Sequence, residues 1–266
     1  MHDLQKAGLM KLMSAFLIDL ILMMILVTGA VWLLSAATGY DNYNNTMESE
    51  IQSIRDSYGI SKIVENHKVD LQDYLYLTEE QKNELPEDVR NTIENCIKDI
   101  NSNEAILDAY SMVTSLTILI VSLGLLFPFV ILEFIVPIIL KNGQTVGKKI
   151  FGIGVMRLDG VKVTPIVVFV RSILGKYTLE TMFLVAMALP LYFDIGSIFN
   201  IGAIALLLIF QIILVIVTKT NSTIHDILSS TVTVDIQSQR IFESREAKQE
   251  FIRRIHEEEA NKAKYF

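Results

Sequence analysis

The sequence is poor in cysteine and in catalytic motifs. Its single cysteine, Cys96, excludes an intrachain disulfide and a zinc site built from several cysteines. The sequence contains no H-E-x-x-H motif and no recognisable Ser/His/Asp or Cys/His constellation. These absences argue against an enzyme, so we expect no catalytic residue, no metal site and no cofactor.

Charge is also missing from long stretches of the chain. Apolar residues make up 51% of the 266 positions and are gathered into runs. Leu12–Ala37 contains one charged residue, Asp19, and Ile198–Val217 contains none. A membrane-spanning helix needs about 20 apolar residues. The first run is far longer than the core of a signal peptide, roughly 7–15 residues, which favours a membrane anchor over a cleaved signal.

Two further spans complete a predicted four-helix membrane protein. The second lies within Ile106–Leu140, with Glu133 near its end. We interpret residues 165–176 as a segment at the membrane interface and Tyr177–Phe193 as the third crossing. The alternative is one long tilted helix that begins near Ile166. Because backbone groups in hydrocarbon must bond to one another, all four spans should be helices. The predicted fold class is therefore an all-α membrane protein.

The charges between the spans predict an orientation. Basic residues flank the start of the first span and fill the segment 141–176, whereas the connector around Asp194 has no Lys or Arg. Lys and Arg concentrate in the cytoplasmic loops of membrane proteins. We therefore expect both termini and the loop 141–165 in the cytoplasm, and residues 39–105 and the Asp194 turn outside.

Two polar regions lie outside the predicted membrane core. From Asp41 to Glu104 the chain carries 15 acidic and 6 basic residues, with helices expected at Thr46–Tyr58 and Glu87–Ile100. Cys96 is then expected on an outward helix face. The tail is polar with a helical pattern. Each region is either a solvated surface or a docking surface for a protein partner. The predicted organisation is a first span (1–38), an acidic extracytoplasmic insertion (39–105), a membrane core (106–235) and a cytoplasmic helical tail (236–266).

A glycine-rich basic segment, GQTVGKKIFGIGVMRLDG, begins at Gly143 after the second span. It is not a phosphate-binding loop, because one residue is missing between the glycines and Lys149 replaces the required hydroxyl. We interpret it as a loop at the membrane surface, in which Gly143 ends the second helix and Lys148 and Lys149 attract anionic headgroups, each contributing about 1 kcal/mol. A hairpin turning at Asp159–Gly160 should follow. A basic loop against a membrane does not indicate nucleic-acid binding.

The order of these motifs is similar to that of the RDD family of bacterial integral membrane proteins. AFLID in the first span is followed by GQTVGKKIFGIGV, by an Arg that opens the third span, and by HDILSSTVTV after the fourth. The similar part covers roughly residues 1–38 and 125–235. The residues that align with characteristic family positions are Asp19, Gly143, Gln144, Thr145, Gly147, Lys148, Gly152, Arg171, His225, Asp226 and Thr231.

One position departs from the family pattern. Leu12 stands where the family usually has an Arg, with Lys11 beside it. The resemblance implies a multi-pass protein of the bacterial cell membrane, with transport or cation/proton antiport proposed for some members.

Charged residues inside the spans form the candidate site. Asp19 and Glu133 each lie eight residues from a flanking lysine, about 12 Å along a helix, so we expect them at similar depth, with Glu180 shallower. Charges within a bilayer usually face inward and find partners. One interpretation is a proton or cation site of Asp19 and Glu133, with Arg171 as a movable counter-charge. The other is a permanent Asp19–Arg171 pair that fixes helix packing.

His225 and Asp226 follow the last span. Such a pair is weak support for catalysis or metal binding, and we expect Asp226 to cap a helix or to pair with the basic segment 141–176. The leading hypothesis is a transporter that works as a homo-oligomer, because four spans are few for transport. The alternatives are an accessory or scaffold subunit of an envelope complex, binding partners through residues 39–105 or the tail, and the handling of lipids at the inner leaflet.

Overall fold

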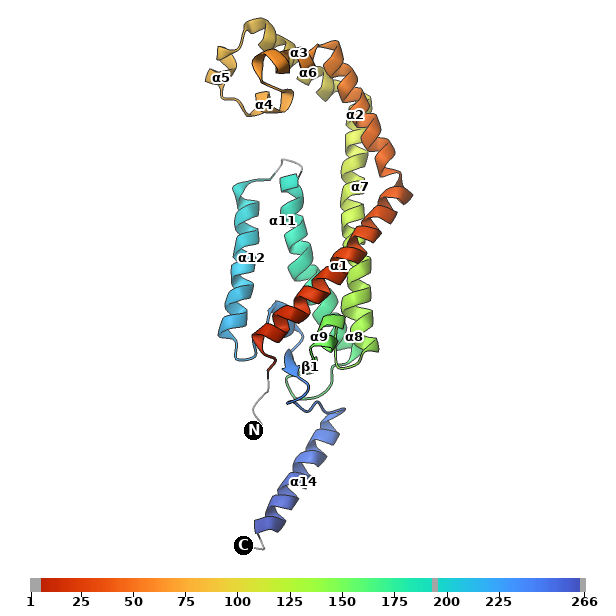
Figure 1. Ribbon diagram of the computed structural model, residues 1–266, viewed down its shortest axis with the longest axis vertical. Helices are drawn as coiled ribbons and strands as arrows, with labels where there is room; N and C mark the ends of the chain where they lie inside the picture. The colour runs from red at the N-terminus through yellow and green to blue at the C-terminus, as the bar shows by residue number, and fades with distance from the viewer. Residues whose placement is uncertain (1–5, 193–195, 264–266) are drawn as a thin grey trace. The chain divides into compact units, whose positions relative to one another are not determined.

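A computed structural model describes residues 6–192 and 196–263, with side chains as far as residue 261. The predicted Asp194 turn lies outside these described residues. The fold is mostly helical, and four helices are long and apolar enough to cross a membrane, as expected (Figure 1). They are Leu9–Thr38 (α1), Glu104–Ile139, Pro165–Tyr192 and Ile198–Val217 (α12).

The third of these helices is continuous from Pro165 to Tyr192, in place of an interfacial segment followed by a separate crossing. It comprises α10 (Pro165–Phe169), η2 (Val170–Met182) and α11 (Phe183–Tyr192). The hydroxyl of Thr164 accepts a hydrogen bond from the backbone N–H of Val167, and proline suits the first turn that follows. The middle part, η2, is a π-helix, which has more residues per turn and is frequent at functional sites.

The second membrane helix also contains a π-helical part. It comprises α7 (Glu104–Phe129), η1 (Val130–Ile135) and α8 (Val136–Ile139). Pro128 lies just before η1 and cannot donate a backbone hydrogen bond, which favours a change of helical pattern there. The change rotates the residues that follow relative to a regular α-helix.

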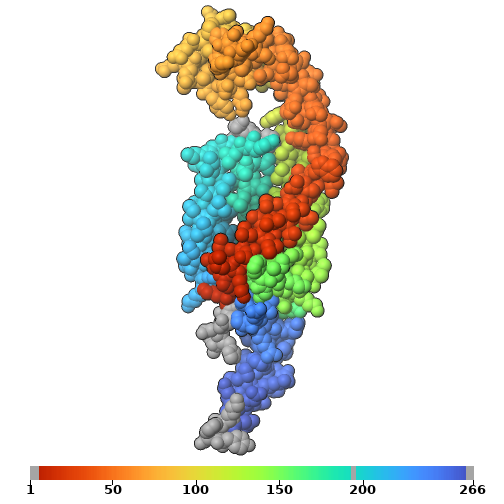
Figure 2. All heavy atoms as spheres, in the orientation of Figure 1, coloured from red at the N-terminus to blue at the C-terminus, as the bar shows by residue number. Residues whose placement is uncertain are grey.

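The fourth membrane helix is almost entirely apolar, with Asn200 and Gln211 as its polar residues. None of the residues of α12 is buried, and Ile198 and Phe199 are 81% and 82% exposed. α12 lies beside α11, and its outer face is open in the space-filling view (Figure 2). A helix that is hydrophobic all round is typical of a membrane span, because lipid or another chain covers such a surface.

A small antiparallel sheet corrects the all-helical expectation. β1 (Ile153–Arg157) pairs with β2 (Thr231–Asp235), with Ile153 opposite Asp235. The predicted hairpin turn is present, because Arg157 N–H donates to the carbonyl of Val161 and Gly160 has φ 84°. The main partner of β1, however, comes from beyond the fourth span. The sheet therefore joins two segments that lie about 80 residues apart in the sequence.

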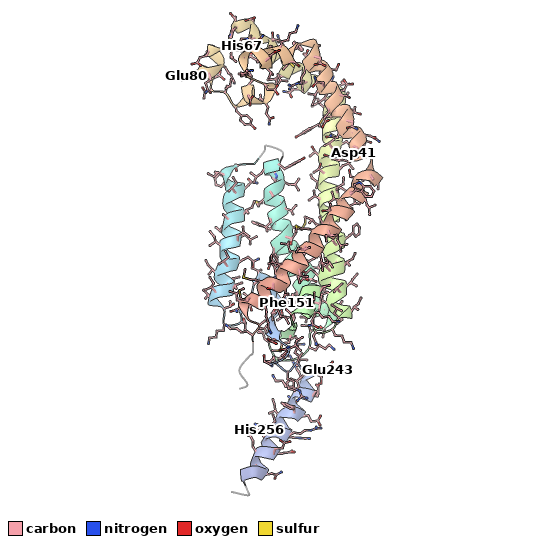
Figure 3. All side chains as sticks on the ribbon, viewed as in Figure 1. Asp41, His67, Glu80, Phe151, Glu243 and His256 are labelled. Carbon is pink, nitrogen blue, oxygen red and sulfur yellow. The ribbon has the colours of Figure 1, made fainter. Side chains whose placement is uncertain are left out.

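The polar tail packs on this sheet where it begins. Ile241 packs against buried Met156, Val232 and Val234, and the helix α14 (Arg245–Ala263) follows. Two ion pairs reinforce the packing, Lys162–Glu243 (3.2 Å) and Arg245–Asp159 (3.1 Å). In addition, Lys248 Nζ donates a hydrogen bond to the backbone carbonyl of Asp159 (2.5 Å). Figure 3 labels Glu243 just before α14 and His256 within the helix.

Residues 29–124 form a compact unit with its own core, and the residues before and after them form the other unit. The helices that lie wholly within the unit of residues 29–124 are α2 (Tyr40–Ser57), α3 (Ile60–His67), α4 (Leu71–Tyr76), α5 (Glu79–Glu84) and α6 (Glu87–Ser102). The two helices predicted there correspond to α2 and α6, and the three short ones were not predicted. Cys96, expected on an open helix face, is fully buried with Ile60 and Ile93.

Candidate functional site

Asp19 ties the first span to a short helix, α9 (Val146–Ile150). Its carboxylate accepts a hydrogen bond of 2.5 Å from the Thr145 hydroxyl and one of 2.7 Å from the backbone N–H of Gly147. Thr145 in turn caps α9 by accepting from the backbone N–H of Lys148. A side chain at Gly147 would collide with the backbone carbonyl of Ala15. The glycine therefore permits the close approach that Asp19 requires.

The loop before α9 is folded onto the sheet. Lys141, Asn142 and Gly143 all have positive φ, so the left-handed turn expected at Gly143 begins two residues earlier. The Gln144 amide donates to the carbonyl of Ile153 at 2.8 Å. Gly143 and Gln144, together with Thr145 and Gly147, are buried within the protein. Of the residues assigned to headgroup contact, Lys149 is the exposed one.

Glu133 joins the second span to the third. Its side chain is only 6% exposed and forms an ion pair with the Lys176 ammonium of η2. The same ammonium lies 5.8 Å from the centre of the Phe129 ring, which packs against Tyr177 at 5.3 Å. An aromatic ring, itself packed against a second one, thus lies beside a charge pair inside the apolar spans.

Arg171 holds the segment after the fourth span. Its guanidinium donates to Oδ1 of Asp226 from Nη2 at 2.7 Å and from Nε at 3.0 Å. Asp226 lies on α13 (Ile224–Leu228) and caps it through Thr223. Burial alone would raise the pKa of Asp226, but the adjacent Arg171 charge holds that pKa well below its usual range. Asp226 is therefore ionised at neutral pH.

Glu180 and His225 form the third contact of this group. The carboxylate of Glu180 lies 2.9 Å from Nδ1 of His225 and accepts its backbone N–H at 3.0 Å. The other ring nitrogen, Nε2, lies 3.3 Å from Nη2 of Arg171. Gly175 faces His225 so closely that a Cβ there would lie 2.9 Å from the His225 Cα. The imidazole is thus held between an acid and a guanidinium.

A small cavity lies among these charges. About 20 Å³ is open to the centre of a water-sized sphere. The charged or titratable groups that line it come from η1, α9, η2 and α13, and they are Glu133, Lys148, Arg171, Lys176 and His225. We name these five residues, with Glu180 and Asp226, the charged cluster.

Lys148 differs from the other cations of the charged cluster. Among the described residues, its ammonium makes no ion pair and no hydrogen bond, while Arg171 and Lys176 each hold a carboxylate. Burial, and next the neighbouring Arg171 charge, lower the pKa of Lys148 to about 7. Lys148 is therefore an amine that changes charge near neutral pH beside a cavity.

The structure distributes the predicted residues differently from the sequence interpretation. Asp19 and Glu133 have separate partners, and within the described part of the chain Asp19 contacts neither Glu133 nor Arg171. Arg171 pairs with Asp226 rather than with Asp19. The expectation that Asp226 caps a helix or pairs with the segment 141–176 is confirmed, because Asp226 caps α13 and Arg171 lies in that segment. Sequence reasoning missed Lys176 as the partner of Glu133 and His225 as the partner of Glu180.

Comparison with protein families matches residues 91–230 to the RDD family, just over half of the chain. The chain belongs to the RDD family. The matched part of this RDD protein contains the complete charged cluster. It begins inside α6 and does not include the first span, which the sequence resemblance had included. No curated protein and no solved structure matches the chain.

Proposed function

We propose that this RDD protein transports a cation across a bacterial cell membrane in exchange for protons, with Glu133 as the proton-linked carboxylate. The observation that carries the proposal is the position of Glu133, 6% exposed inside an apolar span and beside a cavity. A charge at the bilayer centre costs about 2.5–3.5 kcal/mol or more on insertion scales, and such residues commonly mark ion pathways.

The ion pair of Glu133 gives the proposal its two states. With Glu133 ionised, Lys176 is held on the carboxylate. A proton on Glu133 would remove that attraction and leave a buried ammonium, which then favours a different side-chain position or a different helix arrangement. A switch needs two such alternatives whose balance the transported ions change. Arg171, already engaged by Asp226, serves as a fixed rather than a movable counter-charge.

Asp19 has a structural role in this proposal. Its two hydrogen bonds complete the start of α9, and both would be weakened if the carboxylate accepted a proton. The sequence hypothesis had given Asp19 and Glu133 equal parts in ion binding. The proposal now assigns proton coupling to Glu133 and assigns the positioning of Lys148, through α9, to Asp19.

A homo-oligomer is part of the proposal. Four spans enclose little space, and α12 has no buried residue in the single chain. Faces of this kind are covered by lipid or by a second copy. Cross-linking of the purified protein in native-like membranes would distinguish the two, since only an oligomer yields covalent multimers at low reagent concentration.

Transport itself is tested in proteoliposomes. A pH gradient is set across the bilayer, followed with a pH-sensitive dye, and Na⁺, K⁺ or Li⁺ is then added. We expect one of these cations to dissipate the gradient faster than in protein-free liposomes. If none does, with the protein shown to be inserted and folded, cation/proton exchange is contradicted.

A second candidate function is an accessory subunit of an envelope complex. It is favoured by the separate core of residues 29–124 and by two adjacent exposed apolar side chains, Leu75 (63%) and Tyr76 (69%). Purification in mild detergent from the native membrane tests this function. A stable partner that is lost when both residues become Ser supports it, and a protein that always purifies alone contradicts it.

A further inference from the structure

The cavity in the charged cluster has an excess of positive groups in its walls. Lys148, Arg171 and Lys176 line it, and Glu133 is the one carboxylate among its lining residues. Asp226 and Glu180, the other acids of the charged cluster, are not among the residues that line it. The cavity is therefore lined by three basic side chains and one acidic side chain, and the other two acids of the charged cluster do not line it.

The three cations are not equally neutralised. Lys176 is held by Glu133 and Arg171 by Asp226, whereas Lys148 has no acidic partner within the described residues. Lys148 is half-buried, and a charge withdrawn from water without a partner is unfavourable, so such a group loses its charge or acquires a counter-ion. Of the three, Lys148 is the cation that an additional negative charge would stabilise most.

We propose that this cavity binds one small inorganic anion, of the size of chloride, with Lys148 as its principal ligand and Arg171 and Lys176 as flanking charges. The size of the space supports a monatomic ion, because about 20 Å³ of freedom for a water-sized sphere admits one or two water-sized particles and not an organic anion. This inference does not depend on what the protein transports.

Anion binding is coupled to proton uptake. The pKa of Lys148 is about 7, so above neutral pH the amine of Lys148 in the free site is largely uncharged. An anion binds the charged amine more tightly, so the protein takes up a proton as it binds the anion. Affinity therefore falls as pH rises through 7, by at most about tenfold per pH unit. The titratable and charged groups that face Lys148 are Glu133 from η1, Arg171 and Lys176 from η2, and His225 and Asp226 from α13.

The test is the ³⁵Cl NMR linewidth of sodium chloride with the purified full-length protein in detergent, because chloride exchanging with a protein site gives a broadened line. We expect excess broadening that bromide displaces and that is stronger at pH 6 than at pH 8.5. Lys148→Met should remove most of it. Lys149→Met is the matched control, since Lys149 is adjacent but exposed, and it should keep the broadening.

Two further measurements test the role of the charge at position 148 and whether a lipid phosphate occupies the site. Lys148→Arg keeps its charge at all of these pH values, so it should bind chloride with little change between pH 6 and pH 8.5. Native mass spectrometry of the same samples detects a lipid phosphate in the site. The proposal is overturned if Lys148→Met broadens the chloride line as much as the wild type does, or if Lys149→Met loses as much of the broadening as Lys148→Met. It is also overturned if a phospholipid remains bound in a manner that depends on Lys148.

Discussion

Arg171 in the third span lies 2.7 Å from Asp226, a residue that follows the fourth span. The pair connects η2 to α13 and, through β2, to the sheet. Both side chains are largely buried, with exposures of 11% and 7%. Removing one partner from such a pair leaves an unpaired buried charge, which commonly costs about 3–5 kcal/mol.

Asp226→Asn should therefore lower the free energy of unfolding by several kcal/mol, on the order of the loss just given. Replacing both residues, as in Arg171→Met with Asp226→Leu, should cost less than Asp226→Asn alone. Thermal unfolding in a single detergent measures both variants. If the double variant loses as much stability as Asp226→Asn, or clearly more, the two side chains do not stabilise the protein as a pair.

The same pair predicts a dependence on pH. The pKa of Asp226 is depressed by Arg171, so its contribution to stability is present above the ordinary aspartate pKa and is lost as pH falls toward the depressed value. Unfolding followed from pH 6 down to pH 3 should show decreasing stability in the wild-type protein. In Asp226→Asn this part of the slope should disappear, and an unchanged slope would assign the acid sensitivity to other carboxylates.

Gly147 allows α9 to approach the first span. Gly147→Ala places a methyl group against the Ala15 carbonyl and should destabilise the protein by about 1–3 kcal/mol through overpacking. Gly202→Ala is the control, because nothing lies within 4 Å of a Cβ at that position. Melting temperatures of the two variants decide the matter. Similar values would contradict the close approach.

The local parts of the fold could be predicted from sequence, and the contacts between distant parts could not. Apolar runs identify the spans because hydropathy is a property of neighbouring residues. The partner of Glu133 depends on helix rotation. Both η1 and η2 are π-helical, so counting 3.6 residues per turn does not give the faces on which Glu133 and Lys176 lie.

The pairing of β1 with β2 was missed for a related reason. TVTVD at Thr231–Asp235 is short, follows a membrane span, and finds its partner about 80 residues earlier in the sequence. The burial of Cys96 was missed because the core around it is assembled from four helices, α2, α3, α4 and α6, of a predominantly acidic insertion. A solvated surface was the simpler interpretation of that composition.

Cys96 should react with thiol reagents only after unfolding. It is 0% exposed, and burial raises the pKa of its thiol, so the nucleophilic thiolate is both rare and inaccessible. Maleimide labelling of the native protein, compared with labelling in denaturant, measures this protection. Rapid labelling in the native state would contradict the core assigned to residues 29–124.

The orientation predicted from the basic residues is tested with cysteines placed in a Cys96→Ala background. Ser102→Cys and Ser238→Cys both replace exposed residues. A maleimide that does not cross the cell membrane is added to intact cells whose outer envelope layers let the reagent through. It should label position 102. It should label position 238 only after the membrane is disrupted. The opposite pattern would reverse the topology.

Proton coupling through Glu133 is the central claim, and cation-driven dissipation of a pH gradient in proteoliposomes tests it most directly. Glu133→Gln keeps the shape of the side chain and cannot exchange a proton, while Glu104→Gln changes an exposed acid on the same membrane helix. We predict that Glu133→Gln lowers the rate at least tenfold and that Glu104→Gln matches the wild type. Wild-type rates in a correctly folded Glu133→Gln variant would contradict the account.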